Sequence, residues 1–241
     1  MAKPFQLLIP FLTMFDLKKI QTALTEFKLD GWLLYDFRGQ NVLAHRVLQV
    51  PEETVGSRRF CYFIPAAGPP KKLVHRIESG TLDHLPGEKT IYLRWQEFEQ
   101  GIAAITDGSS KIAMEYSPRN GNPYISKVDG GTIELVKSCS KEVVSSGDLI
   151  QFFEARLTPE QWQLHLQADQ FTQKAFELSW DLIRERTHNG GEILETEVQA
   201  AIMDHFHAHN LTTYHPPLVG VNENSGDPHY EPVQGQDKPI K

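Results

Sequence analysis

The sequence of 241 residues has only two cysteines, Cys61 and Cys139, and neither lies in a CxxC or other metal-ligand spacing. This predicts a reduced, cytoplasmic protein without structural disulfides. Basic residues never run longer than a pair, and the formal net charge is −7 at pH 7. Because nucleic-acid binding needs a basic patch that neutralises phosphates, we expect no nucleic-acid partner.

Long apolar segments are also scarce, and no run approaches the ~18 residues of a membrane span. The first residues, "MAKPFQLLIPFLTMF", are apolar but carry only Lys3 as a positive charge. Pro4 and Pro10 interrupt them, and no small-x-small cleavage site follows. We therefore expect neither membrane insertion nor secretion.

Several catalytic motifs are missing from the sequence. It contains no GxGxxG or GxxxxGK[ST] phosphate loop and no GxSxG nucleophile elbow. Cys61 lies within an apolar segment and is predicted to be packed rather than reactive. No pair of Asp and Glu residues stands out by its spacing as a general acid and base. These absences exclude the commonest nucleotide-binding and serine-hydrolase chemistries.

Residues 1–155 alternate short apolar runs with helical patterns, which predicts an α/β layer domain. The helical patterns cover residues 16–28, 95–105 and 146–155. "DGGT" at 129–132 is predicted to be a turn. The predicted strands are "GWLLYD" (31–36), "RFCYFIP" (59–65), "KLVHRI" (72–77), "TIYLRW" (90–95), "KIAMEY" (111–116) and "TIELVK" (132–137).

From residue 156 to 241 the pattern changes to long helices. Residues 158–186 predict one helix with Thr158 as N-cap, Pro159 at its first position and Gln161 completing a capping box. "HNGG" ends it, and a second helix follows at about 194–209. The predicted apolar stripe of the first helix comprises Leu164, Ala168, Phe171, Ala175, Leu178 and Leu182. We place a domain boundary near residue 156.

The second helix ends in "HFHAH", which places His205, His207 and His209 in its last turns. His205 and His209 share a face, as two zinc ligands could. No Glu lies between them as in HExxH, and histidines near a helix C-terminus also interact favourably with its dipole. The pattern favours the structural role over a metal site that would recruit His215 or His229.

Residues 215–232, "HPPLVGVNENSGDPHYEP", have the composition of a ligand-binding loop. Leu218, Val219 and Val221 predict a short strand, and the Asn- and Gly-rich run after them predicts a turn. His229 and Tyr230 follow this turn. A neutral His can donate a hydrogen bond to a carbonyl or to its developing oxyanion, so His229 is a candidate binding residue.

This loop resembles the segment of proline-specific metallopeptidases that ends in a His-Tyr pair. These are the Xaa-Pro aminopeptidase and prolidase group, with the M24-type creatinase fold. The upstream segments are similar in order to one bacterial branch of the group, over residues ~30 to 241. They are "GWLLYDFRGQN" (31–41), "RRFCYFIPAAGPPKKLVHRIE" (58–78), "LDHLPGEKTIYLRWQEFE" (82–99), "IAMEYSPRNGNPYISKVDGGTIELVK" (112–137) and "VVSSGDLIQFFEARLTPEQ" (143–161).

The resemblance implies a ribonuclease-H-like α/β domain of creatinase N-terminal type at 1–155. It also implies an incomplete α+β pita-bread domain at 156–241. Complete members bind two divalent metals, Mn, Co or Zn, through two Asp, one His and two Glu. The metals share a hydroxide that attacks a peptide with proline at its second position. The implied substrate-binding residues here are His229 and Tyr230, and a homodimer is the implied assembly.

In this family the first metal-ligand Asp follows the point where the present sequence ends, and Asp237 comes too early to be that residue. We therefore expect no metal ligand within the chain and no peptidase activity from it alone, whether the truncation is natural or not. The alternative is a non-catalytic dimerisation or peptide-binding module derived from the family. Incomplete sheet edges and an apolar helix stripe predict self-association.

"YDFRGQN" offers a second group of candidate binding residues, Asp36, Arg38 and Asn41. They follow a predicted strand, where ligand contacts are common. In the family, the first domain of a neighbouring subunit often closes the active site, and this loop could provide that contact. The simpler interpretation is a turn at the strand end with an exposed ion pair.

Overall fold

The structure, a computed structural model, describes residues 15–54, 56–139 and 141–241. The chain divides into two compact units between Arg156 and Leu157. This division falls where the sequence pattern changes. The identification of the units as a creatinase-type domain and part of a pita-bread domain stays a prediction. The apolar N-terminal segment predicted not to direct secretion lies almost wholly outside the described residues.

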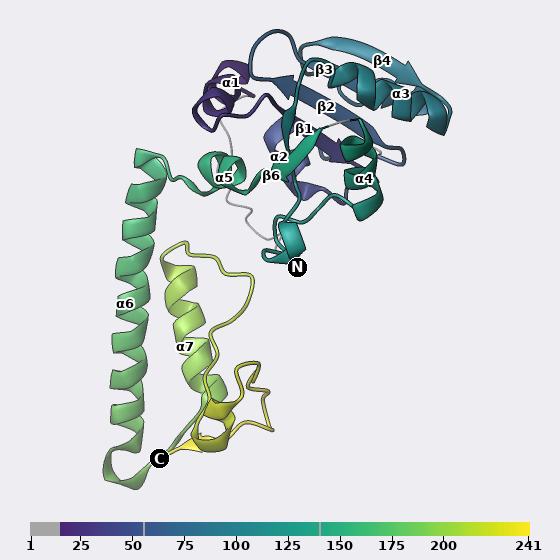
Figure 1. The fold of residues 1–241 in the computed structure, drawn as a ribbon. Helices are drawn as coiled ribbons and strands as arrows, with labels where there is room; N and C mark the ends of the chain where they lie inside the picture. Colours follow the sequence, from purple (N-terminus) through teal and green to yellow (C-terminus); the bar gives the residue numbers. More distant parts are fainter. Residues whose placement is uncertain (1–14, 55, 140) are drawn as a thin grey trace. The chain divides into compact units, whose positions relative to one another are not determined.

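Unit 1, the part of the chain before Leu157, is a mixed α/β unit (Figure 1). Its helices and strands are α1 (Leu17–Glu26), β1 (Gly31–Asp36), α2 (Val42–Leu48), β2 (Phe60–Pro65), β3 (Lys71–His75), β4 (Glu88–Tyr92), α3 (Trp95–Ile105), β5 (Lys111–Met114), α4 (Gly130–Ser138), β6 (Glu142–Ser145) and α5 (Gly147–Ile150). Short 3₁₀ turns η1 (Arg76–Glu78) and η2 (Pro118–Asn120) and the π turn η3 (Gln151–Ala155) complete it.

Its sheet has six strands in the order β4-β3-β2-β1-β5-β6. The central strand β1 pairs antiparallel with β2 and parallel with β5. The sheet is therefore mixed, with antiparallel pairing in β1–β2–β3 and parallel pairing toward both edges, β3–β4 and β5–β6. All six residues of β1 are buried, as expected for a central strand covered on both faces.

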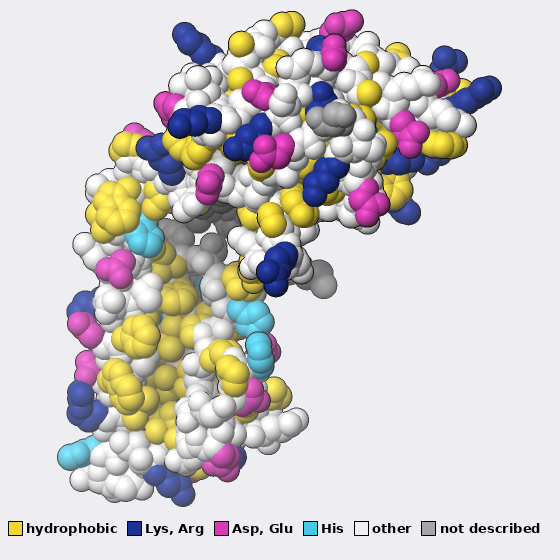
Figure 2. Space-filling model, viewed as in Figure 1, with side chains coloured by type: hydrophobic (Ala, Val, Ile, Leu, Met, Phe, Trp, Pro, Cys, Tyr) yellow, Lys and Arg dark blue, Asp and Glu magenta, His cyan; other side chains and the backbone are white. Residues whose placement is uncertain are grey.

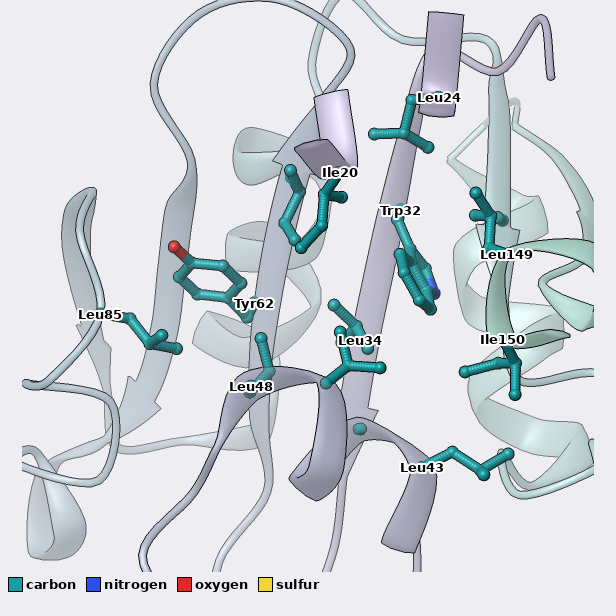
Figure 3. Close-up of a cluster of buried hydrophobic side chains, with 14 of the residues drawn as sticks. Ile20, Leu24, Trp32, Leu34, Leu43, Leu48, Tyr62, Leu85, Leu149 and Ile150 are labelled. Atoms are coloured by element: carbon teal, nitrogen blue, oxygen red, sulfur yellow. The ribbon is translucent and has the colours of Figure 1, made fainter. Parts of the chain in front are cut away.

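Successive side chains of β1 point to opposite faces and enter two different apolar clusters. Trp32 and Leu34 belong to the cluster that α1 and α2 cover (Figure 3). Leu33 and Tyr35 belong to the second cluster, which includes residues of α3 and α4. Both faces of the sheet are thus packed, and polar side chains that the chain buries need hydrogen-bond partners.

The structure corrects the predicted strand "TIELVK" and the predicted turn before it. Residues Gly130–Ser138 form helix α4. The Asp129 carboxylate caps the helix by accepting hydrogen bonds from the backbone N–H and the hydroxyl of Thr132. Ile133 and Val136, three residues apart, are both buried. Capping and this helical burial outweigh the preference of β-branched residues for strands.

Unit 2, the part of the chain from Leu157 onward, contains a helix pair and a small sheet. Its elements are α6 (Pro159–Thr187), the 3₁₀ turn η4 (His188–Gly190), β7 (Ile193–Leu194), α7 (Glu195–Ala208), η5 (Asn222–Gly226) and β8 (Pro239–Ile240). The predicted capping box at Thr158 and Gln161 is present. Strands β7 and β8 pair antiparallel.

The core of unit 2 is small. Its buried apolar side chains are Ala175, Ile193, Val198 and Ile202. Of the stripe predicted on the first helix, only Ala175 is fully buried, and Leu164 is exposed. The stripe is therefore only partly covered by α7.

The predicted strand at 218–221 does not form. Residues 215–232 are all described, and none of them belongs to a strand. Its backbone is engaged differently. Val221 donates its N–H to the Glu195 carboxylate instead of to a neighbouring strand. Gly220 packs so closely on the backbone of Asn224 that an added Cβ would lie 3.0 Å from it. The segment is consequently a loop folded against α7.

Candidate functional site

The loop 215–232 is organised around a buried carboxylate, that of Glu195, the first residue of α7. Its Oε1 accepts the N–H of Val221 at 2.7 Å and the Asn224 side-chain amide at 3.0 Å. Its Oε2 accepts the Tyr230 hydroxyl at 2.6 Å and the N–H of Lys238 at 2.9 Å. A helix N-terminus also favours a negative charge. Glu195 thereby joins four points of the C-terminal segment to one helix end.

These hydrogen bonds determine the ionisation of both partners. Burial alone would raise the pKa of Glu195, but the hydrogen bonds from Tyr230, Lys238, Val221 and Asn224 outweigh it and hold the pKa below its usual value. The Glu195 carboxylate in turn raises the pKa of Tyr230 to about 12, because the hydroxyl donates its proton to a negative partner. The Tyr230 hydroxyl is therefore a hydrogen-bond donor to the protein.

The two residues of the His-Tyr pair consequently have different positions. The backbone N–H of His229 donates to Asp227 Oδ1 at 2.9 Å, which fixes the chain just before the pair. The imidazole of His229 is exposed, and no described residue forms a hydrogen bond with it. Tyr230 is half-buried and bound to Glu195. His229 is the residue of the pair that is free to contact a ligand, and Tyr230 anchors the loop.

Two further contacts close the loop. His215 Nε2 lies 3.2 Å from Glu231 Oε1, so the first and last parts of the loop approach each other. Lys238 forms an ion pair with Glu223 of η5. Both pairs are exposed and contribute little energy individually.

The "HFHAH" histidines do not converge on the loop. His205 Nε2 lies 3.0 Å from the Phe171 carbonyl oxygen of α6, and the His209 ring packs against the Phe171 ring with centroids 4.3 Å apart and planes tilted by 37°. His207 is exposed. Among residues 15–54, 56–139 and 141–241, no group of three or more His, Cys, Asp and Glu could hold a metal ion. The described donors therefore do not fit the two-metal centre that the family resemblance implies.

The "YDFRGQN" candidates are placed at the end of β1. The Asp36 carboxylate is buried and accepts the N–H groups of Gly39 and Asn41, at 2.9 and 2.8 Å. It also lies 3.1 Å from His45 Nε2. Burial would raise the pKa of Asp36, but the nearby His45 side chain and the hydrogen bonds from the Asn41 and Gly39 N–H groups hold it below the usual value. Asp36 pairs with His45 rather than with Arg38, which is exposed at a left-handed turn.

Asn41 connects this turn to a second buried carboxylate that the sequence analysis did not single out. Its amide donates to Tyr35 O and to Glu115 Oε2, both at 2.7 Å. Glu115 Oε1 also accepts the Trp32 indole N–H at 2.7 Å and the Ser146 hydroxyl at 3.1 Å. Burial raises the pKa of Glu115 despite these bonds. The available signal was a Glu directly after the apolar run "IAM" of residues 112–114.

Comparison with known proteins gives a fold but no sequence relative. No protein-family model and no curated protein matches the sequence. Among solved structures, a prolidase of Thermococcus sibiricus is similar over 90% of this chain, with 16% identity and a TM-score of 0.51. A dipeptidase of Pyrococcus horikoshii OT3 is similar over 90% of this chain, with 19% identity and a TM-score of 0.50. Each match spans 56% of the solved chain.

The chain therefore has the creatinase/prolidase-like fold, with the mixed α/β sheet described above. This confirms the predicted resemblance at the level of the fold. The chain spans little more than half the length of these solved chains. Among the described residues, no helix has the length and apolar character needed to span a membrane.

Proposed function

We propose that this chain belongs to the proline-specific peptidases of the creatinase fold and contributes a peptide-binding loop with His229 as its ligand contact. The observation that carries the proposal is the exposed imidazole of His229 on a loop held by the buried Glu195 carboxylate. The fold shared with prolidase and dipeptidase chains over 90% of this chain supports it. The proposed ligand is a peptide with proline at its second position.

The chemistry of the proposed contact follows from the geometry. A neutral imidazole can donate one N–H to the carbonyl oxygen of the Xaa-Pro bond. Pre-organisation lowers the ordering cost of binding, and the loop is already held by the bonds of Glu195. The turn with Asp36, Arg38 and Asn41 stays a proposed second contact, in which the buried Asp36 and Asn41 hold the turn. Arg38 is the member whose side chain is exposed.

The reaction itself is not assigned to residues 1–241. The described residues provide no group of three or more His, Cys, Asp and Glu that could hold a metal ion. In a complete enzyme of this family, the proposed cofactors are two ions of Mn, Co or Zn. A second candidate function is a non-catalytic peptide-binding or dimerisation module. It is favoured by the same His, Cys, Asp and Glu side chains, which form no metal-holding group among the described residues. We also propose a cytoplasmic location, with Cys61 and Cys139 as free thiols.

Peptide binding tests the proposal directly. Isothermal titration with an Xaa-Pro dipeptide should show binding. His229→Ala should weaken this binding about tenfold or more, because the peptide loses one hydrogen bond from a pre-organised donor. His207→Ala is the matched control, since His207 is also an exposed histidine of unit 2. An Ala-Ala dipeptide controls for proline. Equal affinities of the wild type and His229→Ala would contradict the role of His229.

Metal titration tests whether residues 1–241 can carry out the reaction themselves. Mn²⁺, Co²⁺ and Zn²⁺ should each fail to bind tightly in a two-to-one ratio, and Xaa-Pro dipeptides should remain uncleaved. Tight binding of two ions with cleavage would show that residues 1–241 form a complete catalytic centre. Peptide binding without metal binding is expected from both candidate functions, because neither places a catalytic centre in residues 1–241.

A further inference from the structure

Four arginines that are scattered along the sequence lie together at one end of the sheet of unit 1. The strand register brings them together, because the start of β2 pairs with the end of β3, and His75 at the end of β3 pairs with Tyr92 at the end of β4. β4 is one edge of the sheet, whereas β6, the last strand before the boundary with unit 2, is the opposite edge. The four residues, which we call the arginine patch, are Arg58 and Arg59 before β2, Arg76 after β3 and Arg94 after β4.

Helix α3 connects the side chains of the arginine patch. The Arg59 guanidinium lies over the Phe98 ring of α3, with 4.7 Å between its central carbon and the ring centroid. The pKa of Glu97, also in α3, is lowered first by backbone N–H donors and further by the positive charges of Arg94 and Arg76. Both of these guanidinium groups therefore lie near the first turn of α3.

The positive charges of the patch are not neutralised by the part of the chain that the structure describes. None of the four guanidinium groups forms an ion pair with a described carboxylate. Two nearby carboxylates are engaged by backbone groups instead. Glu78 accepts the N–H groups of Ser57 and Arg58, and Glu97 accepts that of Leu93 at 2.7 Å. The patch thus keeps a local excess of positive charge in a chain whose net charge is −7.

Exposed apolar side chains lie beside the arginines. Ile77 follows Arg76 directly and is 66% exposed. Leu93 and Trp95 flank Arg94 and are 47% and 60% exposed. Figure 2 shows Lys and Arg side chains beside hydrophobic ones at the end of unit 1 where Figure 1 draws β4 and α3. Because Arg and Trp are enriched among the residues that dominate binding at protein interfaces, this combination indicates an interaction surface.

We propose that the arginine patch, together with Ile77, Leu93 and Trp95, binds an acidic segment of a partner protein that also carries apolar side chains. Guanidinium groups form paired hydrogen bonds with carboxylates, and clusters of arginines recognise acidic motifs in this way. The apolar side chains of the segment cover Trp95 and its neighbours. The net negative charge of the chain repels acidic proteins at long range, but salt screens this repulsion and leaves the contacts at the patch to decide binding.

A nucleic acid fits the same surface less well. Affinity for nucleic acid rests on neutralising many phosphates along a continuous basic groove. The patch offers four positive charges, and the carboxylates of Glu78 and Glu97 lie among them. A short protein segment, whose carboxylates meet the arginines while its apolar side chains meet the exposed apolar residues, matches both features of the surface.

Fluorescence anisotropy of a labelled peptide of Glu and Leu residues tests the proposal on the full chain. The peptide should bind, and its affinity should fall as the NaCl concentration rises, because salt screens exposed charges. A peptide with Gln in place of every Glu should bind about tenfold or more weakly, since it cannot form charge-assisted hydrogen bonds with the arginines.

Variants of the chain locate the binding surface. Arg76→Gln combined with Arg94→Gln should weaken binding about tenfold or more, because two charged donors are lost. The matched control is Arg119→Gln combined with Arg186→Gln, which changes the net charge equally at exposed arginines outside the patch. Trp95→Ala should also weaken binding about tenfold or more. Circular dichroism verifies that each variant remains folded.

Three results would overturn the proposal. They are no binding of the acidic peptide at low salt, equal weakening by the two double variants, and tighter binding of a single-stranded oligonucleotide of equal charge than of the peptide. The proposal does not depend on the loop of unit 2, so His229→Ala should bind the acidic peptide as the wild type does. Failure at the arginine patch and failure at His229 are therefore distinguished by the two peptides.

Discussion

The two units bury their side chains in different ways. Unit 1 has two apolar clusters, one on each face of a six-stranded sheet. Unit 2 has a single small cluster around Ala175 and Ile202. Each unit nevertheless buries one glutamate completely, Glu115 in unit 1 and Glu195 in unit 2. In unit 1 the carboxylate is set within an extensive apolar core, whereas in unit 2 it is a principal organiser of the structure.

The stability of unit 1 and the geometry of the loop in unit 2 therefore depend on different interactions. Burial of apolar area is the dominant favourable term in folding, so unit 1 should hold its structure when one polar contact is lost. The loop of unit 2 has few buried apolar side chains, and Leu218 is exposed. Its order depends on directed hydrogen bonds to Glu195. Regions of this kind open locally at lower free energy than a packed core.

The largest effect expected from this comparison involves one residue type in both units. Phe63 of β2 is 1% exposed and belongs to a core cluster, whereas Phe176 of α6 is 61% exposed. Phe63→Ala should lower the free energy of unfolding of unit 1 by about 3–5 kcal/mol, because it removes buried area and leaves a cavity. Phe176→Ala should change stability by about 0.5 kcal/mol or less.

Urea unfolding followed by circular dichroism, with hydrogen exchange to assign each transition to a unit, measures both variants. A loss of several kcal/mol on Phe176→Ala would show that the Phe176 side chain is packed within the folded chain. That outcome would remove the contrast between the units.

A smaller, local effect is expected for Glu195→Ala. The substitution leaves the N–H groups of Val221 and Lys238 without their acceptor. Losing the acceptor for buried donors costs about 1–3 kcal/mol. Amide exchange at Val221 and Lys238 should therefore accelerate, while amides of β1 and β2 keep their protection. Equal acceleration in both units would contradict the local role of Glu195.

Elements with strong local signals could be predicted from the sequence. Thr158, Pro159 and Gln161 predicted the start of α6, and the capping hydrogen bonds are present. α4 was predicted wrongly, because the β-branched residues of "TIELVK" were weighted above the N-cap at Asp129. Helix α2 was missed, although Asn41 caps it, because the same segment also resembles a strand-end turn.

The candidate site could be predicted only in part, for a physical reason. His229 and Tyr230 follow a turn-forming run, and local sequence identifies such positions. Glu195 could not be identified, because its hydrogen-bond donors come from residues 221–238, which reach it only after tertiary folding. Glu115 depends in the same way on Trp32 and Asn41, more than 70 positions earlier in the chain.

The two buried glutamates should give opposite dependences on pH. The pKa of Glu195 is lowered, so its contribution to stability is present above the unfolded value of about 4.5 and is lost as the pH falls through the folded pKa. The pKa of Glu115 is raised, so its contribution is present below that unfolded value and is lost as the pH rises through the folded pKa.

The comparison uses Glu115→Gln and Glu195→Gln, each measured against the wild type by hydrogen exchange in its own unit. With rising pH, the wild type should lose stability relative to Glu115→Gln and gain stability relative to Glu195→Gln. Difference curves with the same sign of slope would contradict the opposite environments of the two carboxylates.

The smallest expected effect is that of Tyr230→Phe. It removes one of the donors to Glu195, while the backbone N–H groups of Val221 and Lys238 and the Asn224 amide remain in place. Exchange of loop amides should therefore accelerate by roughly tenfold or less. Tyr214→Phe is the control, because Tyr214 is 99% exposed and its hydroxyl bonds to no described residue. If Tyr230→Phe reduced peptide affinity as much as His229→Ala while loop exchange stayed unchanged, the Tyr230 hydroxyl would contact the peptide itself instead of anchoring the loop.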